Sequence, residues 1–127
     1  MRVAFTSSGG EIVDQHFGQA AHFFLWEIGP ERAEPVGRVD VLLGAGDEED
    51  RIAARAGAIA GCAIVYTQQI GGPAAARLVA RRIHPMKTQA EVPVAEVVEK
   101  LQQVLRGRPP PWLRKAMGEV APAPSEE

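Results

Sequence analysis

Residues 62–67 (CAIVYT) form a continuously apolar segment, and this segment narrows the possible folds more than any other. A strand without polar alternation is typical of a sheet that is covered by helices on both faces. Gly61 precedes the segment and Gly71-Gly72-Pro73 follows it. The proline indicates that a helix begins there, because proline suits the first helical turn. We therefore expect a central strand in a layered α/β fold.

The other segments predict the elements around this strand. Strand patterns occur at residues 2–6, 22–28, 36–43 and 83–88, and helix patterns at residues 48–60, 71–82 and 93–107. The second and third strands should form a hairpin, and Pro85 favours an edge position for the last strand because proline cannot donate to a ladder. This order predicts a five-stranded mixed sheet with helices on both faces, in three layers.

Length and composition indicate one soluble domain. The chain has 127 residues, of which 46% are hydrophobic. We expect an α/β domain over residues 1–107, a Pro/Trp segment over 108–117 that docks on the body or on a partner, and a disordered tail over 118–127. A net charge of -2 argues against nucleic acid as a partner. No apolar run approaches the roughly 20 residues of a spanning helix, so we expect no membrane and a cytoplasmic protein.

The loop after the first strand carries DQHFG at residues 14–18. The imidazole of His16 can bind a metal ion through one nitrogen while an acceptor holds the other, and Asp14 or a backbone carbonyl can be that acceptor. Gly18 would let the backbone come close to a bulky ligand. The residues alone equally allow a histidine that caps a turn and binds nothing.

The segment QQIGGPAAAR at residues 68–77 has the features of an anion site. Gly71 and Gly72 can expose successive N–H groups at a helix start, and Arg77 lies just over one turn further on. The alternative is a plain strand-to-helix turn in which the glycines serve only geometry.

The expected topology brings these two motifs together. If strands 2–6 and 62–66 are parallel neighbours, the loops that follow them leave the same edge of the sheet, where ligands of open α/β sheets bind. His16 should then lie near the glycine pair. Lys87, at the end of the last strand, should reach the same edge and can meet an anion there.

Cys62 and His84 belong to the opposite edge. Cys62 stands at the start of the central strand, about 15 Å from the edge of His16. We expect a buried structural cysteine, with a thiolate metal ligand as the open alternative because thiolates bind soft metal ions well. A Cys62–His84 pair has too few ligands for a closed metal site, so a local structural role is expected for His84.

Three motifs in order, DQHFG (14–18), QQIGGPAA (68–75) and IHPMK (83–87), followed by PPPWLRKAM (109–117), resemble the NifX family of nitrogenase iron-molybdenum cofactor biosynthesis proteins, which is related to the C-terminal domain of NifB. The resemblance implies a ribonuclease-H-like fold without ribonuclease activity. It also implies a carrier that transiently holds an iron-sulfur precursor of the cofactor, of the NifB-co type. The implied partners are NifB and a NifEN-type scaffold.

The resemblance favours His16 as the one metal ligand, and the anion-site residues then surround the cluster. These residues are Gly18, Gly71, Gly72, Arg77 and Lys87.

A catalytic role finds no support in the sequence. No nucleophile, base and orienting group recur at a recognised spacing, and Asp40 has no evident acidic partners for a two-metal phosphohydrolase site. We expect a protein that is not an enzyme. The competing function is a regulatory or partner-binding module that holds apo-nitrogenase or an assembly scaffold without touching a cluster.

Overall fold

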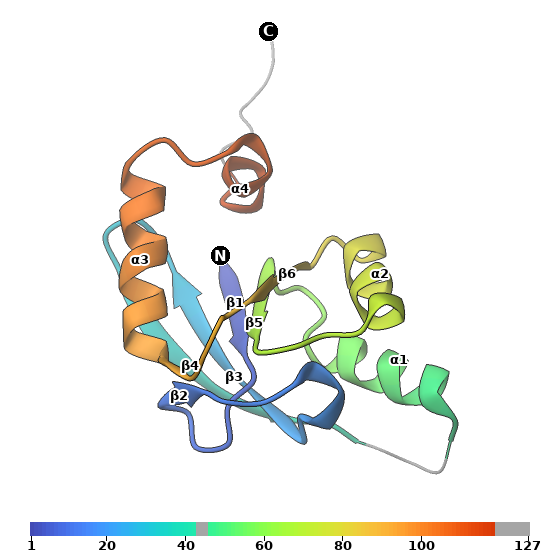
Figure 1. Ribbon diagram of the computed structural model, residues 1–127. Coiled ribbons are helices and arrows are strands. Elements are labelled where there is room, and N and C mark those ends of the chain that lie inside the picture. The colour runs from blue at the N-terminus through green and yellow to red at the C-terminus, as the bar shows by residue number, and fades with distance from the viewer. Residues whose placement is uncertain (43–45, 119–127) are drawn as a thin grey trace, which may run out of the picture.

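The computed structural model describes residues 1–42 and 46–118, and its core is a five-stranded mixed sheet (Figure 1). The strand order is β4-β3-β1-β5-β6. The strands are β1 (Arg2–Phe5), β3 (His22–Ile28), β4 (Ala33–Asp40), β5 (Ile64–Thr67) and β6 (His84–Lys87). β1 pairs with β3 in antiparallel and with β5 in parallel orientation, and β5 is parallel to β6. The predicted mixed sheet, the β3–β4 hairpin, the parallel β1–β5 pair and the edge position of β6 are confirmed.

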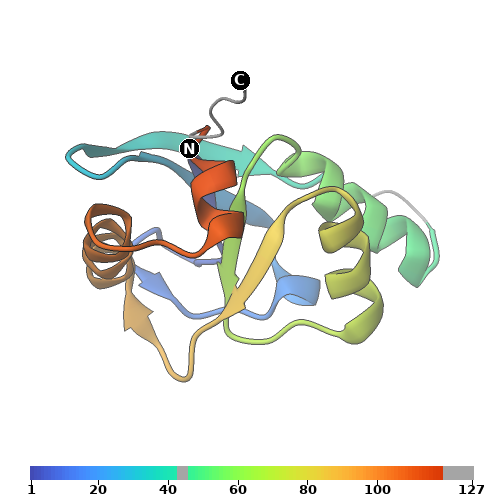
Figure 2. The ribbon, with the colours of Figure 1, turned by 90° about the horizontal axis from the view of Figure 1, so that it is seen from above.

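Helices lie on both faces of this sheet, so the molecule has three layers (Figures 1 and 2). The helices are α1 (Glu48–Ala58), α2 (Gly72–Ala80), α3 (Val94–Arg106) and α4 (Pro111–Ala116). Helices α1 and α2 cover one face, and α3 and α4 cover the other. Among the described residues, no helix is both long and apolar enough to cross a membrane.

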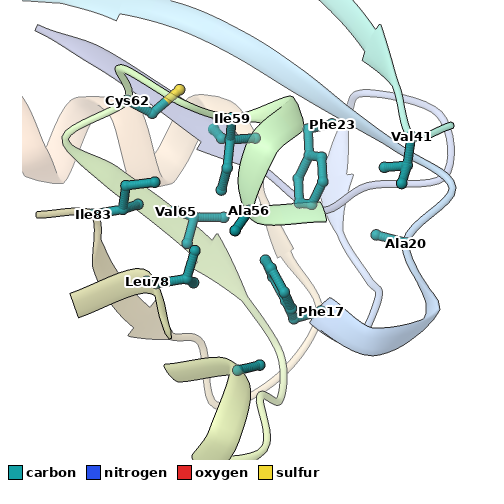
Figure 3. Packing of buried hydrophobic residues seen from close by; sticks show 12 residues of the cluster. Phe17, Ala20, Phe23, Val41, Ala56, Ile59, Cys62, Val65, Leu78 and Ile83 are labelled. Atoms are coloured by element: carbon teal, nitrogen blue, oxygen red, sulfur yellow. The ribbon is translucent and has the colours of Figure 1, made fainter. Parts of the chain in front are cut away.

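The first apolar cluster lies between the sheet and helices α1 and α2 (Figure 3). Its buried members are Ala4, Phe17, Ala20, Phe23, Val41, Ala56, Ile59, Cys62, Val65, Ala74, Leu78 and Ile83. The ring of Phe17, from the loop before β3, lies 5.7 Å from the ring of Phe23 on β3. Burial of such a side chain contributes roughly 1.5–3 kcal/mol, so the cluster fastens this loop to the sheet.

The second apolar cluster lies under α3 and α4. Its buried members are Val3, Phe5, Val13, Ile28, Ile64, Val94, Val97, Val98, Leu101, Leu105 and Leu113. Val3 and Phe5 face this cluster while Ala4 faces the first one, as the alternation of a strand requires. The helical spacing also put Val104 on the apolar face of α3, but Val104 is 43% exposed because it lies at the border of the buried stripe.

Local signals explain where the helices begin. Asp47 accepts a hydrogen bond from the backbone N–H of Asp50 at 3.0 Å, and the Asp50 carboxylate accepts one from the N–H of Asp47, so α1 starts with a capping box. Helix α2 has Pro73 in its first turn, and its N-cap, Gly71, offers no capping side chain. Helix α3 ends at Arg106, and Gly107 is its C-cap, as the predicted stop at this glycine requires.

Several predicted boundaries were wrong. Strand β4 begins at Ala33 rather than at 36, because an edge strand tolerates Pro35 and because β4 carries one extra residue, Val36, opposite the Leu25–Trp26 step of β3, which absorbs the register shift. Helices α1 and α2 end at Ala58 and Ala80 rather than at 60 and 82. The chain turns at those positions.

The sequence patterns missed three short elements and one helix. Strands β2 (Ile12–Val13) and β7 (Val92–Pro93) pair in an antiparallel ribbon, and residues Phe17–Gln19 form a 3-10 helix, η1. Two or three residues are too few for a periodic pattern. The segment 108–117 contains α4, which starts at Pro111 and buries Leu113 against the body. Strand β4 ends at Asp40, so the prediction that it reaches residues 41 and 42 was wrong, and residue 43 lies outside the described residues, as does the predicted tail beyond residue 118.

Candidate functional site

The loops that follow β1 and β5 meet at one edge of the sheet, because these strands are parallel neighbours. His16 and Gln69 form an isolated parallel bridge. The N–H of Phe17 donates to the carbonyl of Gln69 at 2.8 Å, and the N–H of Gln68 donates to the carbonyl of Gln15 at 3.0 Å. The structure therefore joins the two loops by backbone hydrogen bonds on both sides of His16.

Buried hydroxyl groups hold the residue before His16. The carbonyl of Gln15 accepts hydrogen bonds from Thr6 Oγ1 at 3.0 Å and from Thr67 Oγ1 at 3.1 Å. Both threonines are completely buried at the ends of their strands. On the other side of His16, the Phe17 side chain is anchored in the first cluster. Because both neighbours are fixed, the exposed imidazole of His16 is carried on a rigid support.

A shallow depression of about 720 Å³ opens at this edge, and we call it the His16 depression. It is lined by His16, Gly18, Gln19, Gln69, Ile70 and Gly71. The structure thus brings together three of the predicted site residues. The fourth, Gly72, begins α2 one position beyond this lining.

The fold does not demand the glycines of this depression. A Cβ atom at residue 18 or 72 would meet nothing within 4 Å, and at Gly71 it would meet only Pro73 Cδ at 4.0 Å. Gly71 has φ -74° and ψ 159°, which any residue adopts, and neither Gly18 nor Gly72 has a positive φ. Turn geometry therefore does not explain them. Because these residues have no side chains, their backbone atoms are exposed at the depression.

The expected hydrogen bond between Asp14 and His16 does not form. Both carboxylate oxygens of Asp14 accept hydrogen bonds from Ser8, one from its N–H at 2.9 Å and one from its hydroxyl at 2.6 Å. Asp14 therefore ties the loop back to the residues just after β1. An acceptor for the second imidazole nitrogen of His16 has to come from elsewhere.

The two predicted basic residues lie apart from the His16 depression. Arg77 forms an ion pair with Glu49 of α1 and does not line the depression. Lys87 is the last residue of β6 and is paired with Thr67, so it reaches the same edge of the sheet as His16. It too is absent from the lining.

Sequence reasoning missed two other arginines close to this edge. Arg51 and Arg55 of α1 line a second depression that also contains Gly18 and Gly71. The signal was their spacing of four residues, which places them on one side of the predicted helix. That this side faces the start of α2 depends on tertiary packing.

Cys62 is unsuited to ligand binding. It is 4% exposed within the first cluster, and burial raises the pKa of its thiol to about 11. A neutral thiol is a poor metal ligand at neutral pH. Its backbone lies two residues before β5, at the opposite end from His16.

His84 has a local contact that accounts for its position. It is the first residue of β6, at the same end of the sheet as Cys62, and its ring stacks on Trp112 of α4 with centroids 3.8 Å apart. Within residues 1–42 and 46–118, no group of three or more His, Cys, Asp or Glu side chains is arranged to hold a metal ion.

These observations define a small α/β protein with an open depression at the carboxyl edge of its parallel strands. A family model described as "Dinitrogenase iron-molybdenum cofactor" matches residues 1–104. The chain therefore belongs to this family, and the resemblance noted from the three motifs is confirmed. The segment PPPWLRKAM lies beyond the matched residues.

Several curated proteins are similar over most of this chain. It is 43% identical over 119 residues to protein NifX of Herbaspirillum seropedicae, a match that covers 92% of this chain and 82% of that protein. It is 41% identical over 121 residues to protein NifY of Azotobacter vinelandii, covering 93% of this chain but 48% of NifY. The FeMo cofactor biosynthesis protein NifB of Bradyrhizobium diazoefficiens is 32% identical over 130 residues, covering 87% of this chain and 25% of NifB.

A solved structure supports the fold alone. The crystal structure of PH0822 aligns with a TM-score of 0.66 at 23% sequence identity, covering 81% of this chain and 91% of that chain.

Proposed function

We propose that this protein is a non-catalytic carrier in the biosynthesis of the nitrogenase iron-molybdenum cofactor. Its cargo is an iron-sulfur precursor of that cofactor, held transiently in the His16 depression. The observation that carries this proposal is that His16 and Gly71 border one open depression whose glycines the fold does not require. Membership of the dinitrogenase iron-molybdenum cofactor family supports the choice of cargo.

The chemistry of the site suits an anionic iron-sulfur body. An exposed imidazole supplies one neutral nitrogen ligand to iron. The start of α2 supplies backbone N–H groups and the positive end of a helix dipole to the sulfide surface. Lys87, at the same edge, and Arg77, on α2, remain in the proposal as basic residues near the cargo, although neither lines the depression and Arg77 is paired with Glu49.

The proposal also extends to the setting of the protein. Its partners are the proteins that make and receive the precursor, NifB and a NifEN-type scaffold, and it acts in the cytoplasm during nitrogen fixation. The sheet order β4-β3-β1-β5-β6, with helices on both faces, is consistent with the ribonuclease-H-like arrangement that we propose for the fold.

Anaerobic loading tests the carrier function. The protein is incubated with isolated precursor cluster and desalted, and bound iron and the visible absorbance are measured per chain. We expect iron to remain with the wild-type protein and to be lost from His16→Ala. His22→Gln is the matched control, because His22 is a partly buried histidine that does not line the depression.

The results separate the parts of the proposal. A wild-type protein that keeps no iron through the column overturns the carrier function and favours the partner-binding alternative. Equal iron in wild type and His16→Ala overturns only the ligand assignment.

A further inference from the structure

A second depression, of about 390 Å³, lies beside the His16 depression, and we call it the Arg55 depression. It lies between η1, the first turns of α1 and the start of α2. The two depressions share Gly18 and Gly71. The polar groups of the Arg55 depression come from Arg51, Arg55 and Glu48 on α1 and from the backbone around Ala74 on α2.

Arg55 is buried without a counter-ion. Only 5% of the residue is exposed, and its Nε–H donates to the carbonyl of Ala20 at 3.0 Å. The two terminal nitrogens have no hydrogen-bond or ion-pair partner among the residues that the structure describes. A buried charge without a partner is costly, so its presence here points to a ligand that the depression admits.

The terminal nitrogens of Arg55 remain accessible from the depression. In the described ranges, two polar side-chain atoms are sealed from solvent and have no hydrogen-bond partner, namely Gln15 Oε1 and Thr88 Oγ1. Arg55 is not among them, and it lines the depression. The planar guanidinium group therefore presents free N–H donors to whatever enters.

The start of α2 borders the same space through Gly71, Pro73 and Ala74, with Gly72 between them in the chain. Gly71 is the N-cap and has no side chain to accept the first N–H groups, and the first backbone bond of the helix runs from the N–H of Ala75 to the carbonyl of Gly71. The N–H groups of Gly72 and Ala74 are thus left without helical acceptors. Helix α1, in contrast, caps itself with Asp47.

The local charge is positive. Arg51 and Arg55 contribute two cations and Glu48 one exposed carboxylate. Burial lowers the pKa of Arg55, and the neighbouring charge of Arg51 lowers it further, as expected for two cations that have no shared anion. An arginine nevertheless stays protonated at neutral pH.

We propose that the Arg55 depression binds a small oxyanion, that is, a phosphate, sulfate or carboxylate group, through the guanidinium of Arg55 and the free N–H groups at the start of α2. Arginine is suited to this chemistry because its fork of donors matches two oxygens of one anion. The oxyanion is either a free ion or the anionic group of a larger ligand that also occupies the His16 depression. The proposal does not depend on the carrier function.

Amide-resolved NMR of the full chain in chloride buffer tests the proposal. Inorganic phosphate and, separately, acetate are titrated into the wild-type protein. We expect saturable shifts at the amides of Gly72 and Ala74 and at the Arg55 Nε–H with at least one of the two anions. Saturation by acetate alone identifies a carboxylate site, and saturation by phosphate a site for tetrahedral anions. The absence of saturable shifts with both overturns the proposal.

Variants assign the binding to this depression. Arg55→Lys keeps the charge but loses the fork, and we expect affinity to fall about ten-fold. Because Arg55 is buried, the fold of this variant is checked by its thermal melt, and Arg51→Met provides a second, exposed test. Glu48→Gln should strengthen binding, since it removes the opposing carboxylate. Arg81→Met is the control, because Arg81 is an exposed arginine at the far end of α2.

Two results with the variants would overturn the proposed location of the oxyanion. An unchanged affinity in both Arg51→Met and Glu48→Gln overturns the proposed location, even if Arg55→Lys fails to fold. A loss of affinity in Arg81→Met equal to that in Arg51→Met shows a general charge effect and likewise overturns it.

Discussion

Replacing Gly18 is expected to stabilise the fold while blocking the proposed ligand site, and Gly10, between β1 and β3 like Gly18, provides the opposite case. Gly18 has a negative φ and open space at the position of a Cβ atom. Gly10 has φ 92°, and its Cβ would lie 2.9 Å from Phe24 Cε1. The two glycines therefore separate a residue kept for the fold from a residue that the fold leaves free.

The structure gives the sign and size of each effect. Gly18→Ala puts no strain on the folded backbone and lowers the conformational entropy of the unfolded chain. The free energy of unfolding should therefore rise by about 0.4–1 kcal/mol. Gly10→Ala forces a side chain into the left-handed region, which costs roughly 1–2 kcal/mol, and the Phe24 ring must also shift. We expect the two variants to differ in stability by about 2 kcal/mol.

Urea unfolding followed by circular dichroism measures the difference. Equal m-values in the three proteins allow the midpoints to be compared directly. A larger variant, Gly18→Leu, is then loaded anaerobically with the precursor cluster; it should fold as well as wild type and retain less iron. If Gly18→Ala lowers stability by more than about 1 kcal/mol, the glycine serves the fold, and our explanation of the bare depression fails.

Three further substitutions test the support beneath His16, the docking of α4 and the burial of Cys62. Thr67→Val removes one of two hydroxyl donors to the Gln15 carbonyl and should cost about 1 kcal/mol in urea unfolding, with faster hydrogen exchange at residues 15–17. Leu113→Ala should cost about 2 kcal/mol and expose α4 to proteolysis, because this side chain is 2% exposed in the second cluster. In the wild-type protein, the Cys62 thiol should lower the free energy of unfolding by about 1.4 kcal/mol per pH unit between pH 9 and pH 11, because in that window the thiol ionises in the unfolded chain but not in the folded protein, where its pKa is about 11. Cys62→Ala should abolish this contribution to the pH dependence.

The convergence of the two loops could be predicted because it follows from topology. RVAFT and CAIVYT indicate neighbouring strands, and parallel pairing sends the following loops to one edge. The support beneath His16 was also readable in principle. Both strand segments end in threonine, and Thr6 and Thr67 direct their hydroxyls to the same carbonyl. The pattern was missed because terminal threonines usually indicate only β propensity.

Other parts of the site could not be derived from local patterns. The ion pair of Arg77 with Glu49 and the burial of Arg55 both depend on how α1 packs against α2, and the residues between these helices do not specify that packing. Asp14 was expected beside His16 because it is close in sequence, but Ser8 offers it two donors. Spacing in the sequence predicted that Asp14 and His16 lie close together. It could not predict that the donors of Ser8 would take both carboxylate oxygens of Asp14.

The contrast between His16 and Cys62 bears on why the proposed carrier would hold its cargo at this edge. A carrier has to release its cargo, and a set of thiolates would bind an iron-sulfur body tightly. The chain's cysteine is buried with a raised pKa at the opposite end of β5, whereas the imidazole stands exposed beside bare backbone. A single nitrogen ligand with backbone donors around it gives weaker, reversible attachment. If Gly18→Cys, which adds a thiol at the depression, binds the precursor more tightly and slows its transfer to a NifEN-type scaffold, release is limited by ligand strength. If transfer is unchanged, partner docking controls release instead.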